Sequence, residues 1–159
     1  PQQGGHALSA GGMRLVILNA GYLGSLLWGI LLLAVARRRT SARAGLAALG
    51  LVVVVTTVWL VRPIIGFGFG FGAVMGVVLI ACSRLLPATA AQVVLRGLGV
   101  FSILYALFDI RDDVFLADAT ALTDASMLAA ETGVPSMIWG VLWLALGIGV
   151  VWAARRWIT

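Results

Sequence analysis

The sequence contains little charge and almost no cysteine or histidine. Only 11% of its 159 residues are charged, lysine is absent, and there is one Cys and one His. A single Cys excludes an intramolecular disulfide and a zinc site built from several thiolates. Hydrophobic residues make up 62% of the chain, and the mean hydropathy is +1.08. An ordinary soluble domain carries about 25% charged residues, so a soluble globular protein is excluded.

Acidic and basic residues are separated along the chain. All six acids lie between Asp109 and Glu131, whereas the eleven arginines stand mostly in short clusters between apolar runs. Clusters in these positions are typical of membrane topology. The net charge of +5 is therefore not interpreted as nucleic-acid binding, and the lipid bilayer is the expected surrounding.

Five long, nearly uncharged runs separate these clusters. A membrane crossing needs roughly 20 apolar residues in a helix. The sequence predicts an all-α integral membrane protein with about five transmembrane helices, forming a single polytopic domain over residues 1–159 after a Gly-rich N-terminal loop at 1–13. The predicted crossings are residues 15–36, 44–61, 64–83, 88–108 and 134–154.

The arginine distribution predicts an orientation. Five crossings place residues 37–43, Arg84 with Arg96, and the C-terminal Arg155 and Arg156 on one side. Loops rich in arginine stay in the cytoplasm. We therefore expect a cytoplasmic C-terminus, with the N-terminus and the acidic segment outside.

The acidic segment, residues 109–133, precedes the last crossing. A short interfacial helix is predicted at about 123–132, since Gly133 suits the helix end and Pro135 follows as a stop. Asp124 has two interpretations: a cap or first-turn residue of this helix, or a metal ligand or catalytic carboxylate. The remaining acids near the end of the fourth crossing are interpreted as an interfacial charge patch with Arg111; these are Asp109, Asp112 and Asp113.

Three further features have both a structural and a functional interpretation. Gly68, Gly72 and Gly76 recur every fourth residue, which favours close helix packing; a non-helical Gly/Phe segment lining a cavity is the alternative. Arg96 lies about two turns inside the fourth crossing, where it either snorkels or pairs with a lipid headgroup, substrate or partner. The six Trp are interpreted as interfacial anchors and His6 as an exposed loop residue. Lipid or partner contacts are also assigned to Arg37, Arg38 and Arg39.

Two segments resemble a known family. Residues 4–29 contain AGYLGS after a Gly-rich stretch, and residues 123–143 read TDASMLAAETGVPSMIWGVLW. They are similar to bacterial membrane zinc metallopeptidases related to the site-2 proteases. In that family the first segment follows the catalytic helix, and the second runs from an Asp-Ala pair through Thr-Gly-Ile/Val-Pro into a Trp-rich last helix.

The resemblance implies an intramembrane zinc hydrolase in a bacterial cytoplasmic membrane. Its zinc would be held by an H-E-x-x-H helix and a distant acid, with Asp124 as the candidate acid here. A chain with one His contains no H-E-x-x-H, so zinc is expected only if a catalytic helix precedes Pro1, and these residues alone are expected to be incomplete or inactive. The alternatives are a non-catalytic subunit of a larger membrane complex, of respiratory or photosynthetic type, and a small transporter using Arg96 and the acids near residue 110.

Overall fold

The structure is a computed structural model that describes residues 13–116 and 123–158. In these residues all regular secondary structure is helical. Five of the helices are long and apolar enough to cross a membrane, which confirms the predicted fold class. In chain order the elements are α1 (Arg14–Val35), α2 (Arg39–Leu60), α3 (Phe67–Leu85), α4 (Ala88–Arg111), the π-helical turn η1 (Asp112–Leu116), α5 (Asp124–Thr132) and α6 (Ser136–Ile158).

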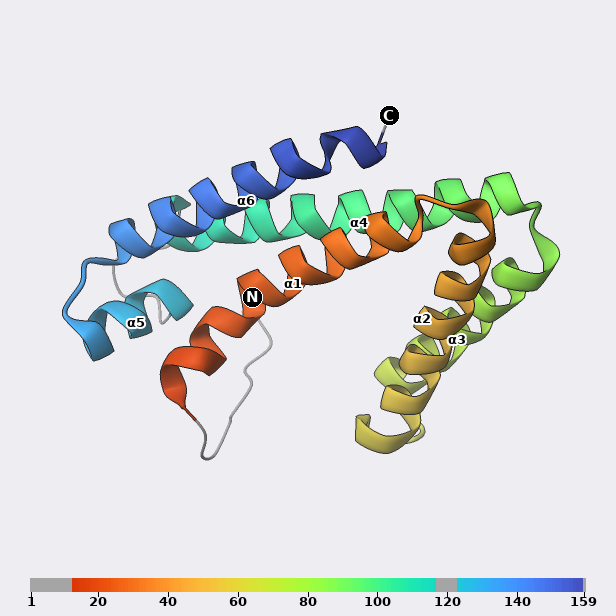
Figure 1. The fold of residues 1–159 in the computed structure, drawn as a ribbon. Coiled ribbons are helices and arrows are strands. Elements are labelled where there is room, and N and C mark those ends of the chain that lie inside the picture. Colours follow the sequence, from red (N-terminus) through yellow and green to blue (C-terminus); the bar gives the residue numbers. More distant parts are fainter. Residues whose placement is uncertain (1–12, 117–122, 159) are drawn as a thin grey trace.

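The helices form two groups joined through α4. Helices α1, α4 and α6 run alongside one another, and α2 with α3 makes a hairpin that leaves them at an angle (Figure 1). The short α5 packs beside α1, η1 and α6 at the end of the molecule remote from the hairpin. The hairpin is attached through a buried cluster that includes Ala42 and Leu46 of α2 and Ala91 and Leu95 of α4.

Four predicted helix boundaries are wrong by three to five residues. Helix α3 begins at Phe67, not at residue 64, and α6 continues to Ile158, not only to residue 154. Helix α2 begins at Arg39, not at residue 44, and α4 continues to Arg111, not only to residue 108. Arginine ends a hydrophobic run in a sequence but not a helix, because its long side chain reaches the polar interface while its backbone stays in the hydrogen-bonded helix.

The Gly/Phe run is helical from Phe67 onward, so the cavity-lining alternative is wrong for these residues. A Cβ on Gly76 would lie 2.6 Å from Val54 Cγ2, and one on Gly72 would lie 2.3 Å from Thr57 Oγ1. Gly68 faces the same helix at a looser distance, 3.6 Å from Val61 Cγ1. Gly72 and Gly76 therefore let α3 approach α2 closely, whereas a side chain at Gly68 would make only ordinary van der Waals contact with Val61, just after α2.

A second close helix contact lies between α1 and α4. The sequence did not predict this contact. A Cβ on Gly29 would lie 2.8 Å from the carbonyl oxygen of Gly99, and one on Gly99 would lie 3.0 Å from that of Gly29. Gly29 continues a small-xxx-small series with Gly21 and Ser25 in α1, whereas Gly99 has Leu95 and Ile103 four residues on either side in α4. The pattern in α1 could have indicated a close contact, but it does not show that α4 is the partner helix.

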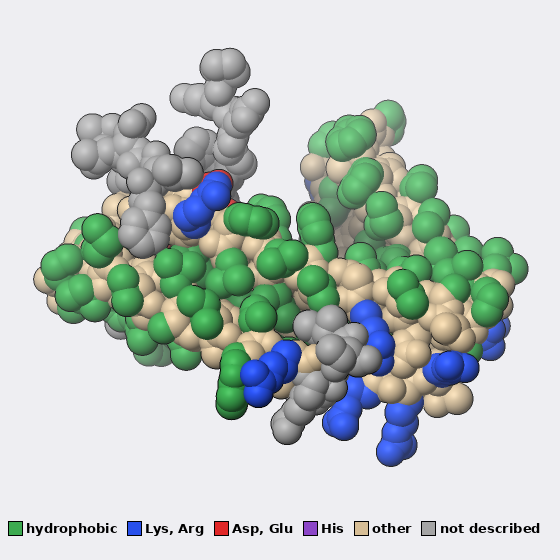
Figure 2. Space-filling view, turned by 90° about the horizontal axis from the view of Figure 1, so that it is seen from above, with side chains coloured by type: hydrophobic (Ala, Val, Ile, Leu, Met, Phe, Trp, Pro, Cys, Tyr) green, Lys and Arg blue, Asp and Glu red, His purple; other side chains and the backbone are tan. Residues whose placement is uncertain are grey.

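The arginine-rich turns meet at one end of the bundle. Arg43 donates a hydrogen bond to the Leu86 carbonyl at 2.6 Å, and Gln92 Nε2 donates to the Ala36 carbonyl at 2.7 Å. These bonds tie the turn between α1 and α2 to the turn between α3 and α4. On the face shown in Figure 2 most blue arginine side chains gather along one edge, and apolar side chains cover much of the rest.

Candidate functional site

A polar cluster lies at the other end of α4 from Gln92, where α1, η1 and α5 meet. The Tyr22 hydroxyl of α1 donates a hydrogen bond to the Asp113 carboxylate of η1. Tyr22 is buried, with 2% of its surface exposed. A carboxylate far along the chain is thus held against the middle of the first crossing.

The π-helical turn η1 separates the acids that the sequence placed in one interfacial patch. Asp112 forms an exposed ion pair with Arg111, at 2.7 Å between Oδ1 and Nη2, as expected for a surface patch. Asp113 instead turns inward to Tyr22, so the patch interpretation is wrong for this residue. A π-helical turn changes the angular step between successive side chains, and such turns are frequent at functional sites.

Helix α5 begins with a capping box that does not use Asp124. Thr123 is the N-cap: its hydroxyl accepts a hydrogen bond from the Ser126 amide at 3.2 Å, and Ser126 Oγ accepts from the Thr123 amide at 2.9 Å. Gly133 ends the helix in the left-handed conformation at φ 73°, as its position predicted. Asp124 is the first-turn residue next to the cap, so capping does not account for its side chain.

Asp124 lies against α1, close to the residue before Tyr22. A Cβ on Gly21 would lie 3.4 Å from Asp124 Oδ2, and the side chain is half-buried. Burial, and then the negative charges of Asp113 and Asp109, raise the pKa of the Asp124 carboxyl above its ordinary value. The three carboxylates therefore belong to one electrostatic environment, which a cation would stabilise.

Trp143 of α6 packs against Tyr22 of this cluster. Its indole Nε1 donates a hydrogen bond to Asn19 Oδ1 at 2.9 Å, and its ring centroid is 4.5 Å from that of Tyr22. Trp143 is 1% exposed, so the interpretation of this Trp as an interfacial anchor is wrong. Leu128 and Ala125 of α5 complete the same buried cluster.

The sequence did not single out Asn19, Tyr22 or Trp143 as site residues. These residues could have been found because they are polar or amphipathic and lie inside long apolar runs. The Asn amide, the Tyr hydroxyl and the Trp N–H group require hydrogen-bond partners inside a membrane. Asn19 and Trp143 are 124 positions apart in the chain, and only the packing of α1 on α6 brings them together.

The described residues do not by themselves make up a metal site. In residues 13–116 and 123–158, no group of three His, Cys, Asp or Glu is arranged to hold a metal ion. A zinc site takes three or four protein ligands. Asp124 fits as a single oxygen ligand because it is half-buried and faces other acids, and further ligands would have to come from outside this cluster.

The other predicted site residues lie away from the acids. Arg37, Arg38 and Arg39 are exposed at the turn between α1 and α2, and Arg96 is half-buried on α4. Glu131 is exposed near the end of α5. His6 and the Gly-rich loop fall outside the described residues.

A family model matches almost the whole chain. The model described as Peptidase M50B-like matches residues 1–154, which confirms the family predicted from the AGYLGS and TDA segments. Neither the curated proteins nor the solved structures gave a match. The matched region includes every residue of the polar cluster.

Proposed function

The chain belongs to the Peptidase M50B-like family, and from that premise we propose that residues 1–159 form the membrane part of a zinc metallopeptidase related to the site-2 proteases. In this proposal Asp124 is the acid that completes a zinc site. The two His and the Glu of an H-E-x-x-H motif come from outside these residues, because the sequence holds a single His.

The observation that carries the proposal is the placement of Asp124. A carboxylate that only capped a solvated helix would face the helix N-terminus. Here Thr123 performs the capping, and Asp124 turns toward α1 beside Tyr22, near Asp113 and Asp109. Concentrating negative charge at a partly buried position is costly for the metal-free protein and favourable once a divalent cation binds.

The surrounding residues would hold the acid in place. Tyr22 donates to Asp113 and packs on Trp143, so a hydrogen bond and a ring contact fix the side chain next to Gly21, against which Asp124 lies. Zinc, when bound, would polarise a peptide carbonyl and activate water. In this proposal Tyr22 and Trp143 position the Asp124 carboxylate and limit the access of water to the site from the side of α1.

Zinc binding by the full gene product that contains these residues tests the proposal. We expect one zinc per chain, and Asp124→Asn is expected to weaken zinc affinity by about 100-fold, because an amide oxygen is a neutral and weaker ligand than a carboxylate. The measurement is zinc content after dialysis against graded zinc buffers. Glu131→Gln is the matched control, an exposed acid on the same short helix.

Equal zinc retention by the wild type and Asp124→Asn would contradict the role given to Asp124. A gene product without zinc that purifies with a fixed set of membrane proteins would instead favour the alternative of a non-catalytic integral subunit. That alternative is kept because no H-E-x-x-H occurs in residues 1–159.

We also propose an orientation in a bacterial cytoplasmic membrane. Hydrogen bonds join the two arginine-containing turns at one end, and basic loops stay in the cytoplasm. In a Cys82→Ala background, a Cys at Ser41 is expected to be protected from an impermeant thiol reagent in intact cells, and a Cys at Gly4 is expected to be labelled. Labelling in the reverse pattern would invert the topology.

A further inference from the structure

Arg96 lines an open hollow on the surface of α4. The hollow has a volume of about 500 Å³ and is otherwise apolar. Phe101 is 68% exposed and Val93 is 64% exposed, so this face of the crossing is directed toward lipid. The lining residues are Val93, Arg96, Gly97, Val100, Phe101 and Leu104.

Along α4, no acid stands near Arg96. The nearest acid on α4 is Asp109, thirteen residues further along the same helix, which is about 20 Å at the rise of an α-helix. In the described part of the chain, Arg96 Nε is a buried nitrogen without a hydrogen-bond acceptor. A guanidinium within a crossing is costly unless an anion or water accepts its hydrogen bonds.

The position of Arg96 along α4 places it near the membrane interface. It stands one helical turn beyond Gln92, which donates hydrogen bonds to the Ala36 and Arg37 carbonyls at the arginine-rich turn. Residues one turn apart share a helix face. Arginines at a membrane surface attract anionic lipids, and this turn carries Arg37, Arg38, Arg39 and Arg43.

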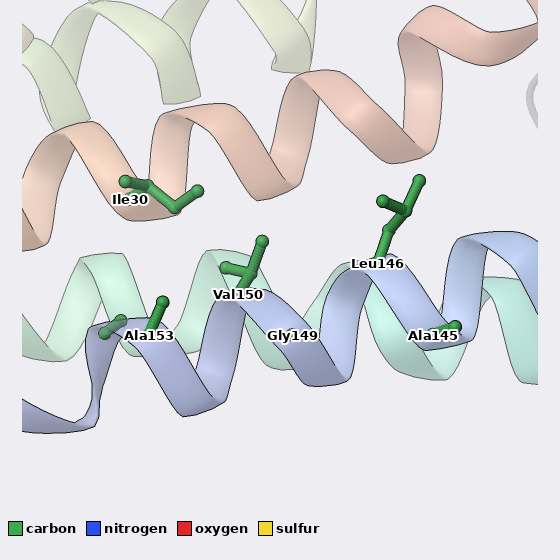
Figure 3. A pocket seen from close by; sticks show the side chains of 7 residues that line it. Ile30, Ala145, Leu146, Gly149, Val150 and Ala153 are labelled. Carbon is green, nitrogen blue, oxygen red and sulfur yellow. The ribbon is translucent and has the colours of Figure 1, made fainter.

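A second surface hollow provides an internal comparison. It lies between α1 and α6, has a volume of about 320 Å³, and is lined only by apolar residues, including Ile30 and Gly149. In Figure 3, Leu146 and Val150 point from α6 toward α1, and Gly149 has no side chain to fill the space beside them. Such a hollow accepts an acyl chain but offers no group that selects the charge of a headgroup.

We propose that the hollow beside Arg96 is a binding site for an anionic phospholipid. The Arg96 guanidinium binds the phosphate, which presents several acceptor oxygens in the geometry that arginine matches. One acyl chain lies along α4 over Gly97 and Phe101. The site is independent of zinc binding and lies toward the arginine-rich end of the bundle, remote from the acids.

Gly97 allows a direct steric test. A Cβ at Gly97 would meet nothing within 4 Å, and the same is true of Gly149 in the apolar hollow. Gly97→Leu therefore fills the proposed site without a clash inside the protein, and Gly149→Leu is the matched control. Arg96→Gln removes the charge while keeping a long polar side chain.

The experiment is native mass spectrometry of the full gene product after exchange into mixed phosphatidylglycerol and phosphatidylcholine. We expect the wild type and Gly149→Leu to retain phosphatidylglycerol, and Arg96→Gln and Gly97→Leu to retain roughly tenfold less, the loss of about 1.4 kcal/mol of binding free energy. Phosphatidylcholine retention is expected to be low in every variant.

Three results would overturn the proposal. Arg96→Gln could retain as much phosphatidylglycerol as the wild type, or phosphatidylcholine could be retained equally well. Competition of inorganic phosphate with the lipid at equal concentration would show a soluble anion site instead. A folded Gly97→Leu protein with unchanged lipid retention would exclude the hollow as the place of the acyl chain.

Discussion

Trp143→Ala is expected to lower the free energy of unfolding by roughly 3 to 4 kcal/mol, the range found for deleting a large buried aromatic side chain. Trp143 is 1% exposed, packs on Tyr22 and donates a hydrogen bond to Asn19. Lipid is as apolar as the protein interior, so little of this loss comes from transfer out of water. It comes from the cavity, the lost ring contact and the lost hydrogen bond from Trp143 Nε1 to Asn19 Oδ1.

The measurement is the melting temperature in detergent with chelator present, where a fall of about 6–16 °C is expected for a chain of this size. Trp152→Ala is the control on the same helix: Trp152 is 64% exposed, and its contact is a cation–π pair with Arg155 at 4.5 Å. That pair is worth about 0.5–1 kcal/mol. Equal effects of the two substitutions would show that the Trp143 cluster does not stabilise the fold.

Gly76→Val is expected to cost about 3 kcal/mol, at the upper end of the range for overpacking a core. A Cβ at Gly76 would approach the Val54 Cγ2 atom to 2.6 Å and the Gly50 carbonyl oxygen to 3.0 Å. Backbone atoms do not move aside as the end of a side chain does. Helices α2 and α3 must therefore separate, and the hairpin loses the close contact of Gly76 with Val54 and Gly50.

Gly70→Val tests the specificity of this effect. Gly70 lies in the same helix, and a Cβ there would meet nothing within 4 Å. We expect a melting temperature within about 2 °C of the wild type, because an exposed substitution typically changes stability by less than about 0.5 kcal/mol. Cysteine crosslinking between α2 and α3 would report their separation in Gly76→Val. An equal loss of stability at both glycines would show that the α2–α3 interface is not responsible, since Val has a higher helix propensity than Gly.

The helical membrane fold follows from the sequence because lipid imposes strong local rules. A crossing must be long enough for the bilayer, and every backbone group must be bonded within its own segment. Those rules predicted the five crossings, whereas the end signals at Gly133 and Pro135 predicted the short helix before the last. The rules for crossings failed at Arg39 and Arg111, where charged residues continue a helix into the interface.

The site required the tertiary structure because its members are far apart in the chain. Tyr22 and Asp113 are 91 positions apart, and only the packing of α1 beside η1 brings them together. A sequence pattern shows that Asp124 can cap a helix, but only the structure shows that Thr123 does so.

The sequence by itself determined the surroundings of this protein, its number of crossings and its family, since each depends on local composition or a short motif. The tertiary structure decided which polar groups meet inside the membrane and which glycines let helices touch, such as Gly29 and Gly99. Those contacts depend on the relative rotation and position of helices. Because lipid is apolar on every side of a helix, it does not favour one rotation over another, and helix packing sets the rotation and position.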